Sequence, residues 1–291
     1  MQVKECYWKR PGSVELYGRL WIPDVPMDAL VVMVHGVGEH SGCYDDVAEK
    51  FTLQSFGFLA FDLRGHGRSS GIRGHASIKV IKEDLQVIIK KMCKKFPDTP
   101  IVLFGHSMGG HVVLNYAVDK KIKVQGIISS SPWLKLVKPP MSLLVMAAKW
   151  ASPIVPWITV RTGVRGNQLS QGSTKRKSTK TDPLLHKKIS IGFFSDLWAN
   201  SKVILQNKHR LNIPLLLMHG TADTLTSYQA SKSFAQNSGE FTTFKQWSDM
   251  HHDLLNDEGN EDVFQYVVKW LSKQIVKNGT VQNSRKMYCV A

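Results

Sequence analysis

The stretch at residues 101–117, IVLFGHSMGGHVVLNYA, decides the fold of this chain of 291 residues. It begins with an apolar run, continues with a serine flanked by glycines, and ends in an apolar segment that is typical of a helix. A buried strand that turns sharply into a helix exposes the residue at the turn, and the helix N-terminus supplies backbone N–H groups beside it. Ser107 occupies that position, which makes it a candidate nucleophile. The alternative is a tight strand-to-helix turn without chemistry.

The same G-x-S-x-G pattern occurs a second time, at residues 67–71 (GRSSG). It follows the strand-like run FLAFDL, but it lies within the glycine-rich stretch RGHGRSSGIRGHAS, and no helical pattern begins before about Ser77. A nucleophile elbow needs a helix directly after the serine. We therefore interpret Ser69 as a turn residue and keep Ser107 as the candidate.

Apolar runs alternate with helical patterns along most of the chain. The runs ALVVMV, GFLAF, IVLF, VQGII and IPLLLM are continuous, as buried parallel strands should be, whereas ELYGRLWI alternates like an antiparallel edge strand. Residues 78–92 and 261–275 carry apolar residues at helical spacing. This alternation predicts an α/β fold with a mostly parallel central sheet and helices on both faces. With 43% hydrophobic residues, the chain fits one large domain as well as two smaller ones, and we expect a single domain over residues 1–291.

Two candidate partners for Ser107 follow it in the order acid and then base that is usual in α/β-hydrolases. Asp223 comes directly after the run IPLLLMHG, and SDMHHDLLND offers His251 and His252 about thirty residues later. A neutral imidazole can accept the serine proton, while the carboxylate holds its tautomer and stabilises the imidazolium. Adjacent histidines point in different directions, so only one can serve. An isolated Asp at this position could instead cap a turn or a helix.

Five motifs in order resemble the monoglyceride lipase and lysophospholipase branch of the serine α/β-hydrolases. They are HGVGEHSGCY at 35–44, DLRGHGRSSG at 62–71, GHSMGG at 105–110, HGTAD at 219–223 and HHDLLND at 251–257. The resemblance covers about residues 20–275 and implies an α/β-hydrolase fold with an inserted cap. It also implies roles for individual residues: nucleophile Ser107, acid Asp223, base His252, and an oxyanion hole formed by the backbone N–H groups of Val37 and Met108. The choice of His252 over His251 comes from the resemblance alone.

The residues that would bind the substrate depart from the family pattern. In similar monoglyceride lipases, the segment that matches GEHSGCY usually carries an Arg before the Tyr. This Arg and the Glu of the same segment line a polar pocket for glycerol. Here Glu39 is present, but Cys43 stands in the Arg position. Family members also often have a Tyr shortly before the Asp-Pro of the cap, where this chain has Thr179, Lys180 and Thr181. We expect Glu39 and Cys43 to border the alcohol; the alternative for Glu39 is a loop carboxylate in an ion pair.

Residues 133–205 separate two predicted strands by far more than a usual connection, which predicts an inserted cap. Between residues 133 and 190 it holds eleven Lys and Arg against one acid, a net charge of +10 out of the chain's +15. Its segment at 141–160 is long and apolar, but Lys149, Pro153 and Pro156 interrupt it. This favours a lid helix on an acyl tunnel or an anionic membrane surface over a spanning helix. The alternative is a cap with solvated lysines packed on its own domain.

The candidate site predicts a serine ester hydrolase, and the resemblance implies that it cleaves acyl lipids, with monoacylglycerol as the leading substrate. A lysophospholipase or a general carboxylesterase is the alternative, and a catalytically silent membrane-binding protein on a hydrolase scaffold is a remote one. We expect no metal and no cofactor. The expected partners are an acyl-lipid substrate and, transiently, an anionic membrane surface. We expect no nucleic acid, because no binding motif accompanies the charge.

The cysteines and the N-terminal residues indicate the cellular compartment in which we expect the protein. Four scattered cysteines have neither the spacing of a metal site nor the density of a disulfide scaffold. The start, MQVKECYWKRPGS, has no apolar region of the kind found in a secretory signal. The expectation is a cytoplasmic protein with reduced thiols that associates peripherally with membranes through its cap.

Overall fold

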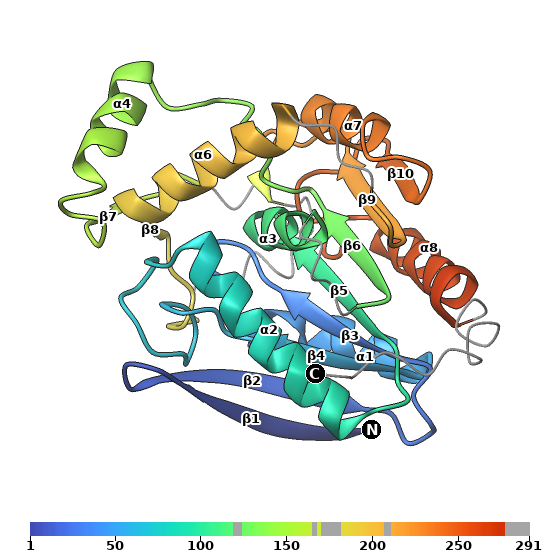
Figure 1. Cartoon of the computed structure of the whole chain (residues 1–291). Coiled ribbons are helices and arrows are strands. Elements are labelled where there is room, and N and C mark those ends of the chain that lie inside the picture. The colour runs from blue at the N-terminus through green and yellow to red at the C-terminus, as the bar shows by residue number, and fades with distance from the viewer. Residues whose placement is uncertain (119–123, 165–167, 170–181, 207–210, 277–291) are drawn as a thin grey trace.

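The computed structural model describes residues 1–118, 124–164, 168–169, 182–206 and 211–276. Eight strands form one sheet in the order β1-β2-β4-β3-β5-β6-β9-β10 (Figure 1). Their bounds are β1 (Gln2–Arg10), β2 (Val14–Ile22), β3 (Ala29–Val34), β4 (Phe56–Phe61), β5 (Ile101–His106), β6 (Gly126–Ser130), β9 (Leu215–Gly220) and β10 (Thr242–Trp247). Every neighbouring pair from β4 to β10 is parallel, and the pairs β1-β2 and β2-β4 are antiparallel. The predicted mostly parallel sheet is confirmed.

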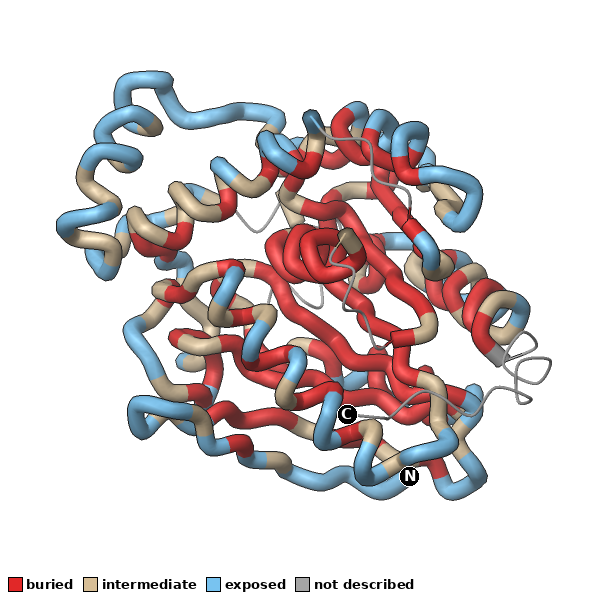
Figure 2. Tube along the Cα trace, in the orientation of Figure 1, coloured by how far each residue is buried: buried red, intermediate tan, exposed pale blue. Residues whose placement is uncertain are grey.

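Helices cover both faces of this sheet, also as predicted. Successive residues of a strand point to opposite faces, so Leu30 and Val32 of β3 enter one core while Val31 and Met33 enter the other. The first core is closed by α2 (Ile78–Lys95), α3 (Met108–Ala117), α6 (Ile191–Gln206) and α7 (Tyr228–Gln236), and the second by α1 (Asp45–Leu53) and α8 (Asn260–Leu271). Figure 2 shows the central strands buried between these two layers. Burial on both faces explains why β3 to β6 and β9 read as continuous apolar runs.

One detail of the sheet differs from the prediction. The run ELYGRLWI forms an antiparallel strand, but β2 is not at the edge, because β1 pairs along its outer side. β1 was not predicted, since of its nine residues only Trp8 is buried. An edge strand that buries only one side chain has no alternating apolar pattern in its sequence from which it could be predicted.

The described residues of the segment predicted to be a cap form two helices and a small sheet. It includes α4 (Ser142–Ala151), the antiparallel pair of β7 (Thr159–Arg161) and β8 (Lys188–Ser190), and α6. α6 packs on α2, α3 and α7, whereas α4 packs against α6 and contributes no buried residue (Figures 1 and 2). No helix in the described part of the chain is both long and apolar enough to cross a membrane.

Candidate active site

Ser107 lies at the turn between β5 and α3, and its backbone has φ 55° and ψ −114°. This conformation is uncommon for a residue other than glycine and is often found at functional sites. The flanking glycines are required by close packing. A Cβ on Gly105 would lie 2.2 Å from the Gly109 carbonyl oxygen, and a Cβ on Gly109 would lie 1.9 Å from the Val34 carbonyl oxygen at the end of β3. The G-x-S-x-G spacing therefore fits a sharp turn pressed against the neighbouring strand.

Ser107, His252 and Asp223 form a continuous hydrogen-bonded series. The Oγ atom of Ser107 is 2.8 Å from Nε2 of His252, and Nδ1 of His252 is 2.7 Å from Oδ2 of Asp223. Ser107 and Asp223 follow the carboxyl ends of β5 and β9, where sites of parallel sheets gather. His252 lies on the loop between β10 and α8. This geometry can move a proton from the hydroxyl to the imidazole while the carboxylate faces the imidazole from the other side.

The surroundings of the series favour a charged imidazole and a charged carboxylate. Burial of His252 opposes its protonation, but the charge of Asp223 and its hydrogen bond, with smaller contributions from Asp253 and Glu39, outweigh burial and raise the pKa of this imidazole. Burial of Asp223 acts to raise its pKa, but the charge of His252 and hydrogen bonds from His219 and His252 hold the pKa well below its usual range. Asp223 is therefore ionised at any pH at which His252 titrates.

The two backbone amides predicted to form the oxyanion hole come from α3 and from the loop after β3. Met108 opens α3, and Val37 lies on the loop that follows β3. The loop is close to the turn, because a Cβ on Gly36 would come within 3.4 Å of the His106 ring. Neither the Met108 N–H nor the Val37 N–H donates a hydrogen bond to another residue that the structure describes.

Glu39 stabilises the loop that follows β3 through two hydrogen bonds. Its Oε2 atom accepts hydrogen bonds from the Gly36 N–H at 2.9 Å and from the Tyr44 hydroxyl at 2.6 Å. Burial and the neighbouring Glu39 charge raise the pKa of the Tyr44 hydroxyl well above its usual value, so it stays a donor. Cys43 lies in the short 3-10 helix η1 (Ser41–Tyr44), is half-buried and packs against the core under α1 and α8.

Glu39, His106 and Asp253 form a polar cluster beside His252. One potential ligand atom from each lies within 4.8 Å of the others, so among the described residues this set has the spacing to hold a cation. The His106 and His252 rings are 5.0 Å apart. Oxygen and imidazole groups of this kind equally accept or donate hydrogen bonds to hydroxyl groups, and we assign no metal to them.

Ser69, the competing serine, has a structural environment. It is buried, its hydroxyl donates to the Asp62 carbonyl at 2.5 Å, and its Oγ accepts from the Tyr17 N–H at 2.9 Å. It lies in a turn with no helix directly after it. These contacts tie the glycine-rich loop to β2.

Sequence reasoning missed the residues that hold Asp223. Oδ1 accepts from the backbone N–H groups of Leu225 at 2.7 Å and Thr226 at 3.0 Å, and Oδ2 accepts from the Thr226 hydroxyl at 2.8 Å. The Nε2 atom of His219 lies 3.0 Å from the same Oδ2. A signal was present in the sequence, since His219 stands in HGTAD at the end of a buried strand, four residues before the acid.

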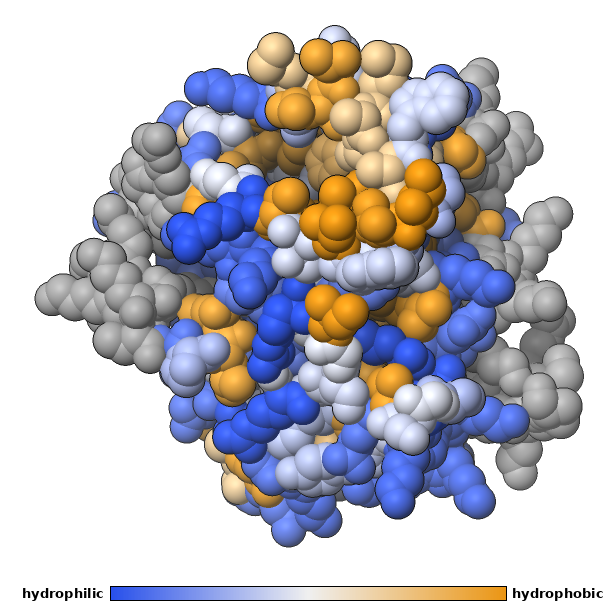
Figure 3. Space-filling model, turned by 90° about the vertical axis from the view of Figure 1, so that its left-hand side faces the viewer, coloured by the Kyte–Doolittle hydropathy of each residue, from blue (hydrophilic) through white to orange (hydrophobic). Residues whose placement is uncertain are grey.

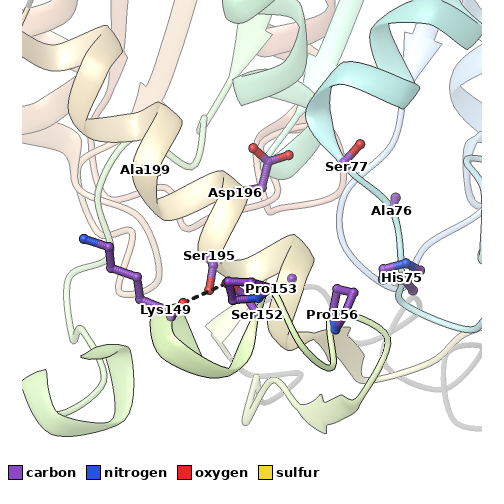
Figure 4. A pocket seen from close by; sticks show the side chains of 11 residues that line it. His75, Ala76, Ser77, Lys149, Ser152, Pro153, Pro156, Ser195, Asp196 and Ala199 are labelled. Atoms are coloured by element: carbon purple, nitrogen blue, oxygen red, sulfur yellow. Dashed lines mark hydrogen bonds between the residues drawn. The ribbon is translucent and has the colours of Figure 1, made fainter. Parts of the chain in front are cut away.

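A separate cavity of about 430 Å³ lies between α4, α6 and the segment before α2 (Figure 4). Its lining includes His75, Pro153, Pro156 and Ser195 but none of the three residues of the hydrogen-bonded series. Asp196, also in the lining, accepts a hydrogen bond from the Ile78 N–H at 2.6 Å. This contact attaches α6 to the first turn of α2 and marks the cavity as a feature of the cap's attachment.

Comparisons with known proteins agree with this geometry. Residues 25–259 match the family model described as "Serine aminopeptidase, S33". Rat monoglyceride lipase is 30% identical over 91% of this chain and 89% of its own length. An uncharacterized abhydrolase domain-containing protein of Dictyostelium discoideum is 33% identical over 88% of this chain, which spans 28% of that relative's length. The crystal structure of Paleococcus ferrophilus monoacylglycerol lipase superposes with a TM-score of 0.82 at 31% identity, covering 89% of this chain and 99% of the other. This chain belongs to the serine aminopeptidase S33 family of α/β-hydrolases, in the part of that family that includes the monoglyceride lipases.

Proposed function

We propose that this protein is a serine hydrolase that cleaves carboxylic ester bonds of acyl lipids, and that it converts monoacylglycerol to fatty acid and glycerol. The observation that carries the proposal is the unbroken series from Ser107 Oγ through His252 to Asp223, with distances of 2.8 and 2.7 Å. The membership of a family that includes monoglyceride lipases supports the lipid substrate.

In the proposed reaction, Ser107 Oγ attacks the ester carbonyl carbon while His252 Nε2 takes its proton. The oxyanion that forms accepts hydrogen bonds from the Val37 and Met108 N–H groups, each typically contributing about 3 kcal/mol. The imidazolium, stabilised by Asp223, then gives its proton to the departing alcohol oxygen. Water, deprotonated by His252, attacks the acyl-serine, and the fatty acid leaves as Ser107 regains its proton.

We infer that Glu39 and Cys43 border the departing alcohol. The charges of Asp253 and Glu39 both act to raise the pKa of His252, so two carboxylates lie near the imidazole that would protonate the departing alcohol. Carboxylates accept hydrogen bonds from glycerol hydroxyls, and the half-buried Cys43 adds no cation to balance them. A neutral polyol therefore fits this end better than an alcohol that carries a phosphate.

We also infer that the cap meets the membrane surface transiently. The exposed fractions of Leu143, Trp150 and Ile154, on α4 and the turn after it, are 63%, 76% and 74%. Figure 3 views the molecule from the side on which α4 lies in Figure 1, and it shows apolar side chains gathered on the upper part of this face, with hydrophilic side chains below them. An exposed apolar patch beside basic residues is typical of an interfacial helix. The basic cluster of Lys175, Arg176 and Lys177 lies outside the described residues.

Turnover of a substrate panel tests the proposal. The panel contains monoacylglycerols, lysophospholipids, diacylglycerols and short p-nitrophenyl esters, and Ser107→Ala serves as the inactive control. We expect the highest kcat/KM for a monoacylglycerol. A higher value for a lysophospholipid would favour the lysophospholipase alternative, and a preference for the short esters would favour a general carboxylesterase. Failure of a fluorophosphonate probe to label the wild-type protein would indicate a scaffold without catalysis.

A further inference from the structure

Two histidines share the carboxylate of Asp223. Oδ2 lies 2.7 Å from His252 Nδ1 and 3.0 Å from His219 Nε2. The side chains of Asp223 and His219 are fully buried, and the exposed fraction of the His252 side chain is 2%. The mechanism proposed above uses His252 and leaves His219 without a role.

The contacts of His219 define its tautomer. Its Nδ1 atom is 2.8 Å from the Oγ of Ser231 on α7, a residue with no exposed surface. An ionised carboxylate only accepts hydrogen bonds, so Nε2 of His219 carries a hydrogen and donates to Asp223. In the neutral ring Nδ1 is then an acceptor, and the Ser231 hydroxyl donates to it. Ser231 thus favours the tautomer in which His219 faces Asp223 as a donor.

The two oxygens of Asp223 are held in different ways. Oδ1 is anchored by the backbone N–H groups of Leu225 and Thr226. Oδ2 is approached only by side chains among the described residues: His252, His219 and the Thr226 hydroxyl at 2.8 Å. The negative charge that His252 meets at Oδ2 is therefore shared with two other donors. Hydrogen bonds to a charged acceptor in a buried site are the strong ones.

We propose that His219, with Ser231 behind it, is a positioning residue for the reaction: it holds Oδ2 of Asp223 toward His252 and limits how strongly this carboxylate stabilises the imidazolium. This inference rests on the proposed function. His219 touches neither Ser107 nor His106 by any described contact, so its effect reaches the reacting atoms through Asp223.

Removal of the donor has a defined effect on the pH profile. The titratable groups that face His252 are Asp223, Asp253, Glu39 and His106, and Tyr228 is a further titratable neighbour of His219. Without the His219 donor, more of the Asp223 charge acts on His252, which favours its protonated form and raises its pKa. His252 must be neutral to accept the serine proton, so the acid limb of kcat/KM moves to higher pH.

Three variants test the role. His219→Phe keeps a ring but removes the donor to Asp223. His219→Gln keeps a donor, an amide N–H that can reach Asp223. Ser231→Ala leaves the histidine but removes the hydroxyl that favours its donor tautomer. We expect His219→Phe to lower kcat about tenfold, because an Asp223 carboxylate that is no longer held orients the His252 ring less well, with KM unchanged and the acid limb shifted up. His219→Gln should keep kcat within about threefold, and Ser231→Ala should shift the acid limb in the same direction by less.

A second readout does not need turnover. The proton on His252 Nδ1 gives a low-field NMR resonance when it is hydrogen-bonded to Asp223. His219→Phe and Ser231→Ala should both shift this resonance, whereas His219→Gln should leave it near its wild-type position. Unchanged kcat, acid limb and resonance in a folded His219→Phe protein would overturn the proposal. If His219→Phe does not fold, an unchanged acid limb and resonance in Ser231→Ala overturn it. If the wild-type protein turns over no ester but the variants still show these resonance shifts, only the proposed function is contradicted.

Discussion

His251 and His252 are adjacent in the chain, but their side chains lie beside different carboxylates. Nδ1 of His252 is 2.7 Å from Asp223 Oδ2, whereas Nδ1 of His251 is 3.3 Å from Asp257 Oδ2. The backbone N–H of His251 also donates to Asp257 at 2.6 Å. The ring of His251 is thus held away from Ser107, and only that of His252 reaches it.

The first prediction separates these two histidines. Replacement of His252 by Ala should lower kcat/KM at least about 1,000-fold, because the proton acceptor is lost. Replacement of His251 by Ala should retain most activity, since its ring lies beside Asp257. Rates on a p-nitrophenyl ester and labelling by a fluorophosphonate measure both. The opposite pattern would assign the base to His251.

The two serines of the repeated pattern give the second prediction. Ser107→Ala should abolish ester turnover and fluorophosphonate labelling while the protein stays folded. Ser69→Ala should keep both, but should lower the free energy of unfolding by about 1–2 kcal/mol, because two buried hydrogen bonds are lost. Urea unfolding of each variant measures stability beside the activity assay. Loss of labelling in Ser69→Ala alone would show that the elbow is misassigned.

The third prediction concerns the alcohol. With Glu39 and Asp253 near His252 and no cation at position 43, a phosphate group on the substrate meets unfavourable charge. Monoacylglycerol should therefore exceed lysophosphatidic acid of the same acyl chain in kcat/KM. Cys43→Arg should narrow the gap by supplying a positive charge, whereas Cys43→Met, which adds length without charge, should not. Equal or faster hydrolysis of lysophosphatidic acid by the wild-type protein contradicts this view of the pocket.

The fourth prediction concerns stability in acid. His111 on α3 is fully buried, and burial lowers its pKa to about 4. In the unfolded chain its pKa is about 6.5, so between these values the unfolded state binds the extra proton and stability falls as pH falls. The contribution lost between pH 7.5 and pH 5 is about 2 kcal/mol. His111→Gln should be less stable than wild type at pH 7.5, but its further loss on going to pH 5 should be smaller by about that amount. Equal losses in urea unfolding would contradict the assignment.

Much of the fold could be predicted because burial leaves a direct trace in the sequence. β3 and β5 are buried on both faces, and their apolar runs predict parallel strands. β1 leaves no such trace, since its single buried side chain, Trp8, sets no period. Which strand lies beside which depends on contacts between distant segments, and no local pattern reports them.

The same distinction applies to the site. The order of Ser107, Asp223 and His252 along the chain predicted a shared site, and the structure brings their side chains within hydrogen-bond distance. His219 was not singled out although it stands in HGTAD, because a histidine at the end of a buried strand gives the same sequence pattern whether it faces the core or the acid. Its partner Ser231 lies twelve residues away on a helix, and only the packing of α7 on β9 brings the two together.

The fifth prediction concerns membrane association, beginning with its apolar part. Leu143→Glu and Trp150→Glu remove exposed apolar surface from α4, which contributes no buried residue, so folding should persist. Binding to phosphatidylcholine vesicles, which depends on apolar contact, should fall in both. A matched control is Leu53→Glu, since Leu53 has an exposed fraction of 77% but lies on α1, across the sheet. If the control reduces binding as much as Trp150→Glu, α4 is not the contact surface.

The charge of the cap should add a term that salt screens. A Lys or Arg near an anionic leaflet contributes about 1 kcal/mol, and the screening length falls from about 10 Å at 0.1 M salt to about 3 Å at 1 M. Binding to phosphatidylserine vesicles should therefore weaken as salt rises, down to the remainder that α4 provides. Changing Lys175, Arg176 and Lys177 together to Glu should reduce the salt-sensitive part while hydrolysis of a soluble short-chain ester stays nearly unchanged. Co-sedimentation at both salt concentrations separates the two terms. Vesicle binding that is indifferent to this triple change would mean that these lysines and arginine are only solvated, and that the substrate reaches the site by another route.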